Sequence, residues 1–305
     1  MTTPTRLIAA LALCTAVALA GAPTGAAEGT PRAASLQLAS VHALVLDLAS
    51  GDTLYAKRAD TPAPIASVTK LMTAMVVLDG GQSLDEWLGI VDWSDEPDKN
   101  AYSRLRIGSE AKRGELLRIA LMSSENLATH VLAQHYPGGV EAFVEAMNAK
   151  ARDLGMTNSR FVDPAGLSTN NRSTAADLGK MLQAAFEYPS IREYTTGYQH
   201  VVQFRNPRYT LGYGNTNPLV ASSRWEASLS KTGYLSEAGR CLVMAAEIDG
   251  RPVGMVLLNS FGTRTPLGDA GRVRRWLTTG DGGRVAGPAL EYERRTGRAL
   301  EEQET

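Results

Sequence analysis

Cysteine and histidine are scarce in this chain, which has two cysteines and four histidines among 305 residues. Cys14 lies in an N-terminal segment that we expect to be removed, which would leave Cys241 without a partner for an intramolecular disulfide. Cys241 opens the apolar run 241–245, so we expect a small buried residue rather than a reactive thiol. The histidines lack the close spacing of metal-binding motifs. The sequence therefore predicts neither a metal nor another cofactor.

An excess of charge of either sign is also absent, since 31 Lys and Arg residues stand against 32 Asp and Glu residues. A near-neutral chain lacks the broad basic surface with which nucleic-acid binders neutralise phosphates, so we expect no nucleic-acid partner. With 44% hydrophobic and 21% charged residues, the composition is that of a soluble globular protein. Its length suits one large domain or two intimately packed ones.

The apolar run over 7–22 is short for a transmembrane helix. It follows Arg6 and leads into small residues that end at Ala27. This pattern favours a signal peptide over 1–27, cleaved after Ala27, rather than an uncleaved membrane anchor. We therefore expect an exported protein, in the periplasm or its equivalent, with no transmembrane anchor once the signal is removed.

Short β-branched or alternating runs bounded by turn residues predict strands near both ends of the chain. These strands are expected at 42–48, 53–58, 228–235, 241–248 and 251–260. A helical period marks most of the intervening chain and one closing segment. These helices are expected at 68–78, 114–122, 128–135, 140–151, 174–186 and 267–278.

Strands at both ends with helices between them predict an α/β (α+β) fold, in which distant segments build one sheet and a helical lobe is inserted. After Gly280 the sequence becomes polar and rich in glycine. We interpret 281–305 as a flexible polar tail whose charges serve solvation.

Ser-x-x-Lys occurs at Ser67/Lys70, Ser109/Lys112 and Ser228/Lys231. Only the first copy opens a strongly apolar helical run, 71–78. On a helix Lys70 shares a face with Ser67, and burial would lower the lysine pKa until a neutral amine can take the serine proton. In a first helical turn, the backbone NH of Ser67 can also face a substrate oxyanion. The alternative is a serine that caps a core helix, followed by an incidental lysine.

Ser-x-Asn occurs twice, at Ser124/Asn126 and at Ser168/Asn170. The second copy lies in the polar stretch 168–172, where ordinary turn chemistry explains it. The first copy lies between two predicted helices. There Ser124 offers a hydroxyl that can relay a proton, and Asn126 offers an amide that can orient a substrate peptide.

Lys-Thr-Gly occurs once, at Lys231, Thr232 and Gly233, inside a predicted strand. The ammonium and hydroxyl can bind a carboxylate, and the glycine lets a substrate approach the backbone. A strand edge also offers NH and carbonyl groups to an extended peptide. The alternative is an ordinary turn at a strand end, which the order of the three motifs makes less attractive.

Together Ser67-Val68-Thr69-Lys70, Ser124-Glu125-Asn126 and Lys231-Thr232-Gly233 resemble the three signatures of serine penicillin-binding proteins and class A β-lactamases. Five segments further resemble the low-molecular-mass D-alanyl-D-alanine endopeptidases, namely 67–78, 121–126, 135–139, 161–167 and 231–233. The resemblance implies a penicillin-binding serine peptidase domain over about 38–280. Its fold would be β-lactamase/transpeptidase-like, with an antiparallel sheet flanked by helices.

The resemblance also implies catalytic roles. Ser67 would form the acyl-enzyme, Lys70 would act as general base, and Ser124 would pass a proton to the leaving amine. The backbone NH groups of Ser67 and Tyr234 would form the oxyanion hole. We expect no catalytic role for Glu125, which occupies the variable position of its motif.

Binding roles follow in the same way. Asn126 would hold the substrate peptide, while Lys231 and Thr232, beside Gly233, would bind the carboxylate of the substrate or antibiotic. The expected ligands are peptidoglycan peptides and, as covalent inhibitors, β-lactam antibiotics.

Three other functions are alternatives to an endopeptidase. A D-alanyl-D-alanine carboxypeptidase of the wider family often carries a C-terminal β-rich domain and an amphipathic anchor, for which this chain lacks the length. A β-lactamase needs a deacylating glutamate, but Glu145 with Asn148 has the wrong spacing and is expected on a solvated helix face. A non-catalytic wall-binding module would not need a complete set of serine, lysine and asparagine.

Overall fold

The computed structural model describes Met1 and residues 35–94, 97 and 102–302. The expected signal peptide, apart from Met1, and its cleavage site lie outside the described residues. Within the described helices none is both long and apolar enough to cross a membrane.

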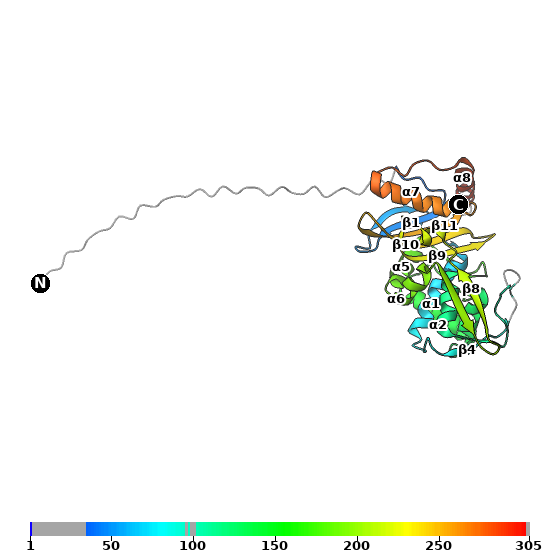
Figure 1. The fold of residues 1–305 in the computed structure, drawn as a ribbon. Coiled ribbons are helices and arrows are strands. Elements are labelled where there is room, and N and C mark those ends of the chain that lie inside the picture. Colours follow the sequence, from blue (N-terminus) through cyan, green and yellow to red (C-terminus); the bar gives the residue numbers. More distant parts are fainter. Residues whose placement is uncertain (2–34, 95–96, 98–101, 303–305) are drawn as a thin grey trace. The chain divides into compact units, whose positions relative to one another are not determined.

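A five-stranded antiparallel sheet forms the centre of the fold (Figure 1). It consists of β1 (His42–Asp47), β2 (Thr53–Lys57), β9 (Glu226–Leu235), β10 (Gly239–Ile248) and β11 (Arg251–Ser260). The strand order is β2-β1-β11-β10-β9, with Val45 of β1 opposite Met255 of β11. All five expected strands are confirmed, as is the assembly of one sheet from segments far apart in the sequence.

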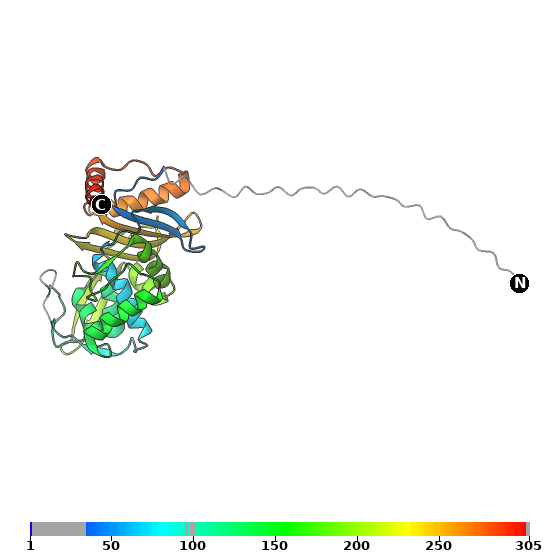
Figure 2. The ribbon, with the colours of Figure 1, turned by 180° about the vertical axis from the view of Figure 1, so that it is seen from behind.

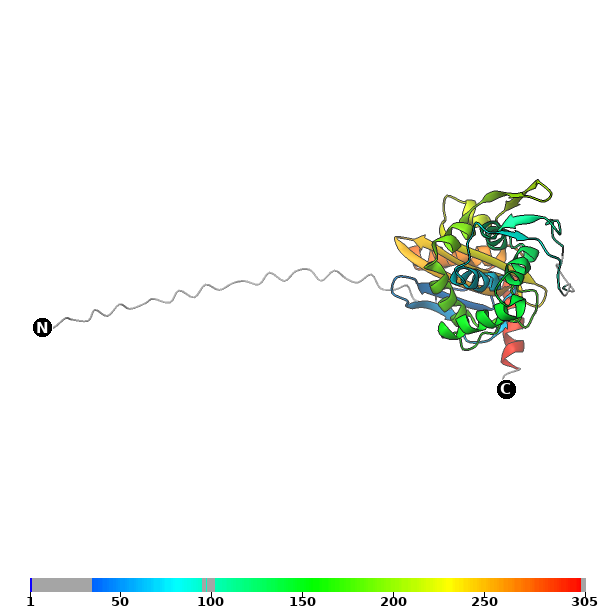
Figure 3. The same ribbon diagram turned by 90° about the horizontal axis from the view of Figure 1, so that it is seen from below.

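Both faces of the sheet are covered, so its central strands are apolar on both sides. In β10, Leu242 and Met244 pack with Trp276 of α7 (Thr265–Thr279) on one face. Val243 and Ala245 belong to the larger core that faces the helical lobe. Successive side chains of a strand point to opposite faces, which explains why 241–246 is a continuous hydrophobic run. Figure 3 shows the helical layer in front of the sheet.

The remaining helices expected from periodicity are confirmed. They are α1 (Lys70–Asp79), α2 (Arg113–Met122), α3 (Asn126–Gln134), α4 (Gly139–Asp153) and α5 (Ala175–Phe186). A short 3-10 helix, η2 (Ala66–Thr69), runs directly into α1. The expected helix start at Val68 is thus a tighter turn that already begins at Ala66.

The sequence patterns did not predict several short elements. They are α6 (Pro189–Thr196), η3 (Pro218–Ala221), the hairpin β7 (Gln199–Phe204) and β8 (Tyr209–Gly214), and the pairs β3 (Ala63–Pro64) with β6 (Arg172–Ser173) and β4 (Trp87–Gly89) with β5 (Glu110–Lys112). In β7 only Val202 and Phe204 are buried, while Val201 is exposed. Because so few side chains of β7 are buried, hydrophobic and polar residues alternate only weakly in its sequence.

The prediction of a flexible tail over 281–305 is wrong for most of this segment. Residues 287–301 form the helix α8 (Gly287–Glu301), drawn in red in Figure 2. Ala289, Glu293 and Gly297 are the buried residues of this helix, and their spacing of four places them on one face. Glu293 accepts a hydrogen bond from Arg58 of the N-terminal hairpin at 2.7 Å. This contact face consists of an alanine, a glutamate and a glycine. It therefore lacks the stripe of large apolar side chains by which helices are recognised in a sequence.

Candidate active site

Ser67 and Lys70 meet where η2 joins α1. The buried Nζ of Lys70 donates to Ser67 Oγ at 3.0 Å, to Asn126 Oδ1 at 2.8 Å and to the carbonyl of Ala165 at 2.6 Å. Asn126 Oδ1 and the Ala165 carbonyl can only accept, so they hold the two N–H bonds of a neutral amine. The lone pair of that amine is then left for the hydroxyl proton of Ser67. This is the geometry of a base beside its nucleophile.

Burial lowers the pKa of the Lys70 ammonium to about 7, against the opposite effect of the carboxylates of Asp163 and Glu125. The desolvation that the apolar sequence around Lys70 predicts is confirmed. A substantial neutral fraction of the amine is therefore available near neutral pH.

Ser124 lies in the turn between α2 and α3 with φ 61°, a region of backbone space that non-glycine residues rarely adopt. Its Oγ accepts a hydrogen bond from the Nζ of Lys231 at 3.1 Å. Burial and the nearby charge of Lys70 hold the pKa of Lys231 well below its usual value. Hydrogen bonds thus join the first motif to the second through Asn126, and the second to the third through Ser124.

Glu125 holds this turn in place. One carboxylate oxygen accepts from the backbone NH of Ala128 at 2.5 Å and caps α3, and the other accepts from Ser103 at 2.5 Å. Burial raises the pKa of the Glu125 carboxyl. These contacts make Glu125 a structural support for the turn that carries Ser124.

Gly233 has a structural role in addition to the one expected of it. A Cβ atom at this position would lie 3.0 Å from the carbonyl oxygen of Ile65 and 3.1 Å from the backbone nitrogen of Ser67. The space left by the missing side chain therefore admits the chain entering η2 rather than only a substrate. The missing side chain of Gly233 lets β9 pack closely against the backbone of Ser67. Tyr234, the next residue of β9, therefore lies near Ser67.

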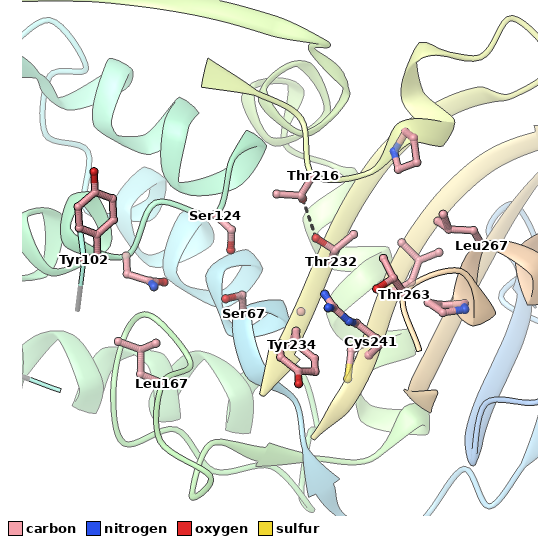
Figure 4. Close-up of a pocket in the computed structure, with 16 residues that line it drawn as sticks. Ser67, Tyr102, Ser124, Leu167, Thr216, Thr232, Tyr234, Cys241, Thr263 and Leu267 are labelled. Atoms are coloured by element: carbon pink, nitrogen blue, oxygen red, sulfur yellow. Dashed lines mark hydrogen bonds between the residues drawn. The ribbon is translucent and has the colours of Figure 1, made fainter. Parts of the chain in front are cut away.

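A cavity of about 470 Å³ opens over these residues (Figure 4). Its lining includes Ser67, Ser124, Asn126, Thr232, Gly233 and Tyr234, so six of the eight residues singled out in the sequence share one cavity. Thr216, which the sequence did not single out, also lines it and shares a 2.6 Å hydrogen bond with the hydroxyl of Thr232. Thr216 follows β8, and no motif marks it.

The loop 161–171 also supports the site in a way that the motifs do not show. Asp163 accepts hydrogen bonds from the backbone NH groups of Ala165, Gly166, Leu167 and Ser168. This turn presents the Ala165 carbonyl to Lys70. An aspartate followed by Pro164 and Gly166 is a recognisable turn signal, but it does not identify the lysine as the target.

The other copies of Ser-x-x-Lys do not form a similar pair. Ser109 hydrogen-bonds to Tyr209, and Lys112 lies on β5 and pairs with Asp85 at 2.7 Å. Ser228 and Lys231 both lie on β9, where the pairing with β10 shifts at Ser228, and the Nζ of Lys231 donates to Ser124 and to the carbonyl of Thr232 rather than to Ser228.

Two further expectations concern α4 and the cysteine. Glu145 is exposed, as expected, and both polar atoms of Asn148 are bonded to the backbone of Phe161. Cys241 is buried, as expected, and burial raises the pKa of its thiol to about 11. Within the described part of the chain, no group of three acidic, histidine or cysteine side chains could hold a metal ion.

A buried lysine within hydrogen-bond distance of a serine, on an antiparallel sheet covered by helices, defines the class of active-site serine enzymes that work through an acyl-enzyme. The sequence matches the D-alanyl-D-alanine carboxypeptidase family of peptidases over residues 28–262. The chain belongs to this family, and the resemblance noted from its motifs is confirmed.

The chain is similar to several characterised proteins. A D-alanyl-D-alanine endopeptidase of Pseudomonas aeruginosa is 48% identical over 282 residues, covering 92% of this chain and 90% of that protein. One of Escherichia coli is 46% identical over 285 residues, covering 93% and 92%. The crystal structure of a Streptomyces DD-transpeptidase has a TM-score of 0.73 at 28% identity, covering 85% of this chain and 98% of that one. The expected fold class is confirmed.

Proposed function

We propose that this protein is a serine D-alanyl-D-alanine endopeptidase that hydrolyses D-alanyl cross-links in peptidoglycan. The observation that carries the proposal is the bonding of Lys70, whose two acceptor-only partners leave its lone pair to Ser67. The relatives from Pseudomonas aeruginosa and Escherichia coli, which this chain matches over nine-tenths of its length, are named for this activity. D-alanyl-D-alanine carboxypeptidase activity is the second candidate, since the family carries that name.

The geometry supports a two-step reaction. Neutral Lys70 takes the hydroxyl proton as Ser67 Oγ bonds to the D-alanyl carbonyl carbon, and the oxyanion accepts from the backbone NH groups of Ser67 and Tyr234. The C–N bond then breaks as Ser124 gives its proton to the leaving amine and regains one from Lys231, with which it is hydrogen-bonded. Water then adds to the ester carbonyl as one of its protons passes through Ser124 to Lys231, and the C–O bond to Ser67 breaks as Lys70 returns its proton to Ser67 Oγ.

Recognition is assigned to the remaining residues of the site. Asn126 lines the cavity beside Ser67 and holds the peptide, and Lys231 with Thr232 binds a carboxylate next to the scissile bond. A β-lactam antibiotic presents a carboxylate and a reactive carbonyl in the same relation, so it would acylate Ser67 as an inhibitor. A relative of known structure, a penicillin-binding protein of Listeria monocytogenes, was solved with ampicillin bound.

We also propose that the protein acts outside the cytoplasm, where its substrate lies. The family match begins at residue 28, directly after the signal-peptide cleavage site expected behind Ala27. Sequencing the N-terminus of the protein recovered from the periplasm tests this location.

The test of function is a timed digest of purified cross-linked dimers and uncross-linked pentapeptides at equal concentration. We expect dimers to disappear faster, with weaker release of terminal D-alanine from the pentapeptides. A Ser67→Ala protein serves as control and should release neither product. Rapid loss of terminal D-alanine while dimers persist would select the carboxypeptidase instead.

The rate of acylation by a labelled penicillin should rise as the pH increases through about 7 and then level off. Lys70 acts as a base only when neutral, and the neutral fraction grows as the pH rises through its pKa. Asp163→Asn removes a negative charge that favours the ammonium form of Lys70. The midpoint of the pH profile of the acylation rate should therefore move to lower pH. Second-order acylation rate constants measured across this range in both proteins check the shift.

The exposed Asp153 provides the control, because Asp153→Asn changes the net charge equally at a residue that is not among the charges acting on the pKa of Lys70. Its midpoint should match that of the unmodified protein. An unchanged midpoint in a folded Asp163→Asn protein would mean that Lys70 does not titrate in the acylation step.

A further inference from the structure

The cavity above Ser67 is lined by a single kind of charge. Among the described residues that line it, Arg240 is the one that carries a full charge, and none is acidic. The buried Lys231 adds amine N–H donors next to Ser124, to which it is hydrogen-bonded. A water-accessible cavity with a guanidinium, further N–H donors and no carboxylate among its described lining residues favours anionic ligands.

Arg240 reaches the cavity from the second strand of the sheet. It stands on β10 opposite Tyr234 of β9, and its guanidinium carbon lies 3.9 Å from the centroid of the Tyr234 ring. Stacking on a ring uses one face of the guanidinium and leaves the donors at its edge available. No described residue forms a hydrogen bond or an ion pair with the guanidinium of Arg240. The side chain is thus held in place while its fork of N–H groups remains open to a ligand.

The site assigned to the first carboxylate is separate from this fork. Thr232 pairs with Leu242 and Tyr234 pairs with Arg240, so the two positions stand two residues apart along the sheet. Two residues of a strand span roughly 7 Å. The cavity continues past β9 to Thr263 and Leu267, which Figure 4 shows on the far side of the strands from Ser124. There is therefore room for more of the leaving peptide than one amino acid.

We propose that Arg240 binds a second carboxylate, carried by the leaving peptide, and thereby favours cross-linked dimers over pentapeptides. The inference rests on the proposed endopeptidase function. A pentapeptide loses one D-alanine, whose single carboxylate belongs with Lys231 and Thr232. A cross-linked dimer loses a whole peptide, which has a carboxylate beside the leaving amine and another at its free C-terminus. A planar arginine fork suits such a carboxylate through two parallel hydrogen bonds.

The experiment compares kcat/KM for three substrates: a cross-linked dimer, the same dimer with the free C-terminal carboxyl of its leaving peptide amidated, and a pentapeptide. Arg240→Gln should lower kcat/KM for the free-acid dimer by about tenfold to a hundredfold, mainly through KM, because charge-assisted hydrogen bonds are lost. The amidated dimer and the pentapeptide should change by less than about threefold. For the free-acid dimer, kcat/KM of the Arg240→Lys protein should lie between those of the unmodified and the Arg240→Gln proteins. Lysine keeps the positive charge but lacks the planar fork of N–H donors.

Arg295→Gln is the matched control, because Arg295 also lies beside a tyrosine ring but is exposed to solvent and belongs to α8. It should leave all three values unchanged. An equal loss on all three substrates would show that Arg240 serves the first carboxylate, and no loss on the free-acid dimer would show that it binds none. Either result overturns the proposal. The proposed endopeptidase function is tested separately in the same experiment. If it is wrong, the unmodified protein should show a higher kcat/KM for the pentapeptide than for the dimer.

Discussion

A Ser67→Ala protein is expected to take up no label from a labelled penicillin and to remain folded. The substitution removes the nucleophile, so no acyl-enzyme can form. It deletes one oxygen from a partly exposed side chain and leaves Lys70 bonded to Asn126 and the Ala165 carbonyl. Gel detection of the label measures acylation, and thermal unfolding followed by circular dichroism measures folding.

Ser109→Ala is the matched control, because Ser109 belongs to a second copy of the same motif but is bonded to Tyr209. This protein should be labelled at the normal rate. Peptide mapping of the labelled unmodified protein should place the penicillin on Ser67. A label found on Ser109, Ser124 or Ser228 would refute the assignment of the nucleophile.

Lys70→Ala should reduce the acylation rate by about a thousandfold, within the range that a positioned general base contributes. The loss should approach that of Ser67→Ala, since residues that act as a unit are strongly non-additive. The rate constant is measured with a labelled penicillin under pseudo-first-order conditions.

Lys112→Ala provides the comparison, because Lys112 occupies the equivalent place in the second motif copy and is paired with Asp85 on the surface. It should acylate normally. If the Lys70→Ala protein also acylated at normal speed, another group would have to accept the serine proton. The buried Lys231, hydrogen-bonded to Ser124, would then be the first to examine.

The fold was predictable wherever one face or both faces of an element are apolar. The run 241–248 indicates a buried strand, and α5 has a regular apolar face formed by residues such as Leu178, Met181 and Leu182. The helix α8 was missed because its buried positions are occupied by alanine, glutamate and glycine. Its contact with Arg58 depends on a charge pair across 235 residues, and hydrophobic periodicity contains no trace of such a pair.

The site was predictable in its reacting groups but not in its supports. The order of the three motifs led to Ser67, Lys70 and Ser124, and hydrogen bonds connect all three motifs. The Ala165 carbonyl has no side chain by which a sequence pattern could have identified it. Thr216 is an unremarkable residue in a loop, and only folding brings its hydroxyl to Thr232.

Residue type, close spacing and the apolar run that follows selected Ser67 and Lys70 as the candidate nucleophile and base, because a serine and a lysine three apart at the start of a helix share a face. Tertiary structure decided which groups hold the protons of Lys70, since Asn126 and Ala165 lie 56 and 95 residues away along the chain. It also decided that the missing side chain of Gly233 admits the entry to η2, and that Arg240 opens into the cavity. Those outcomes depend on the packing of distant segments, and local sequence spacing does not encode that packing.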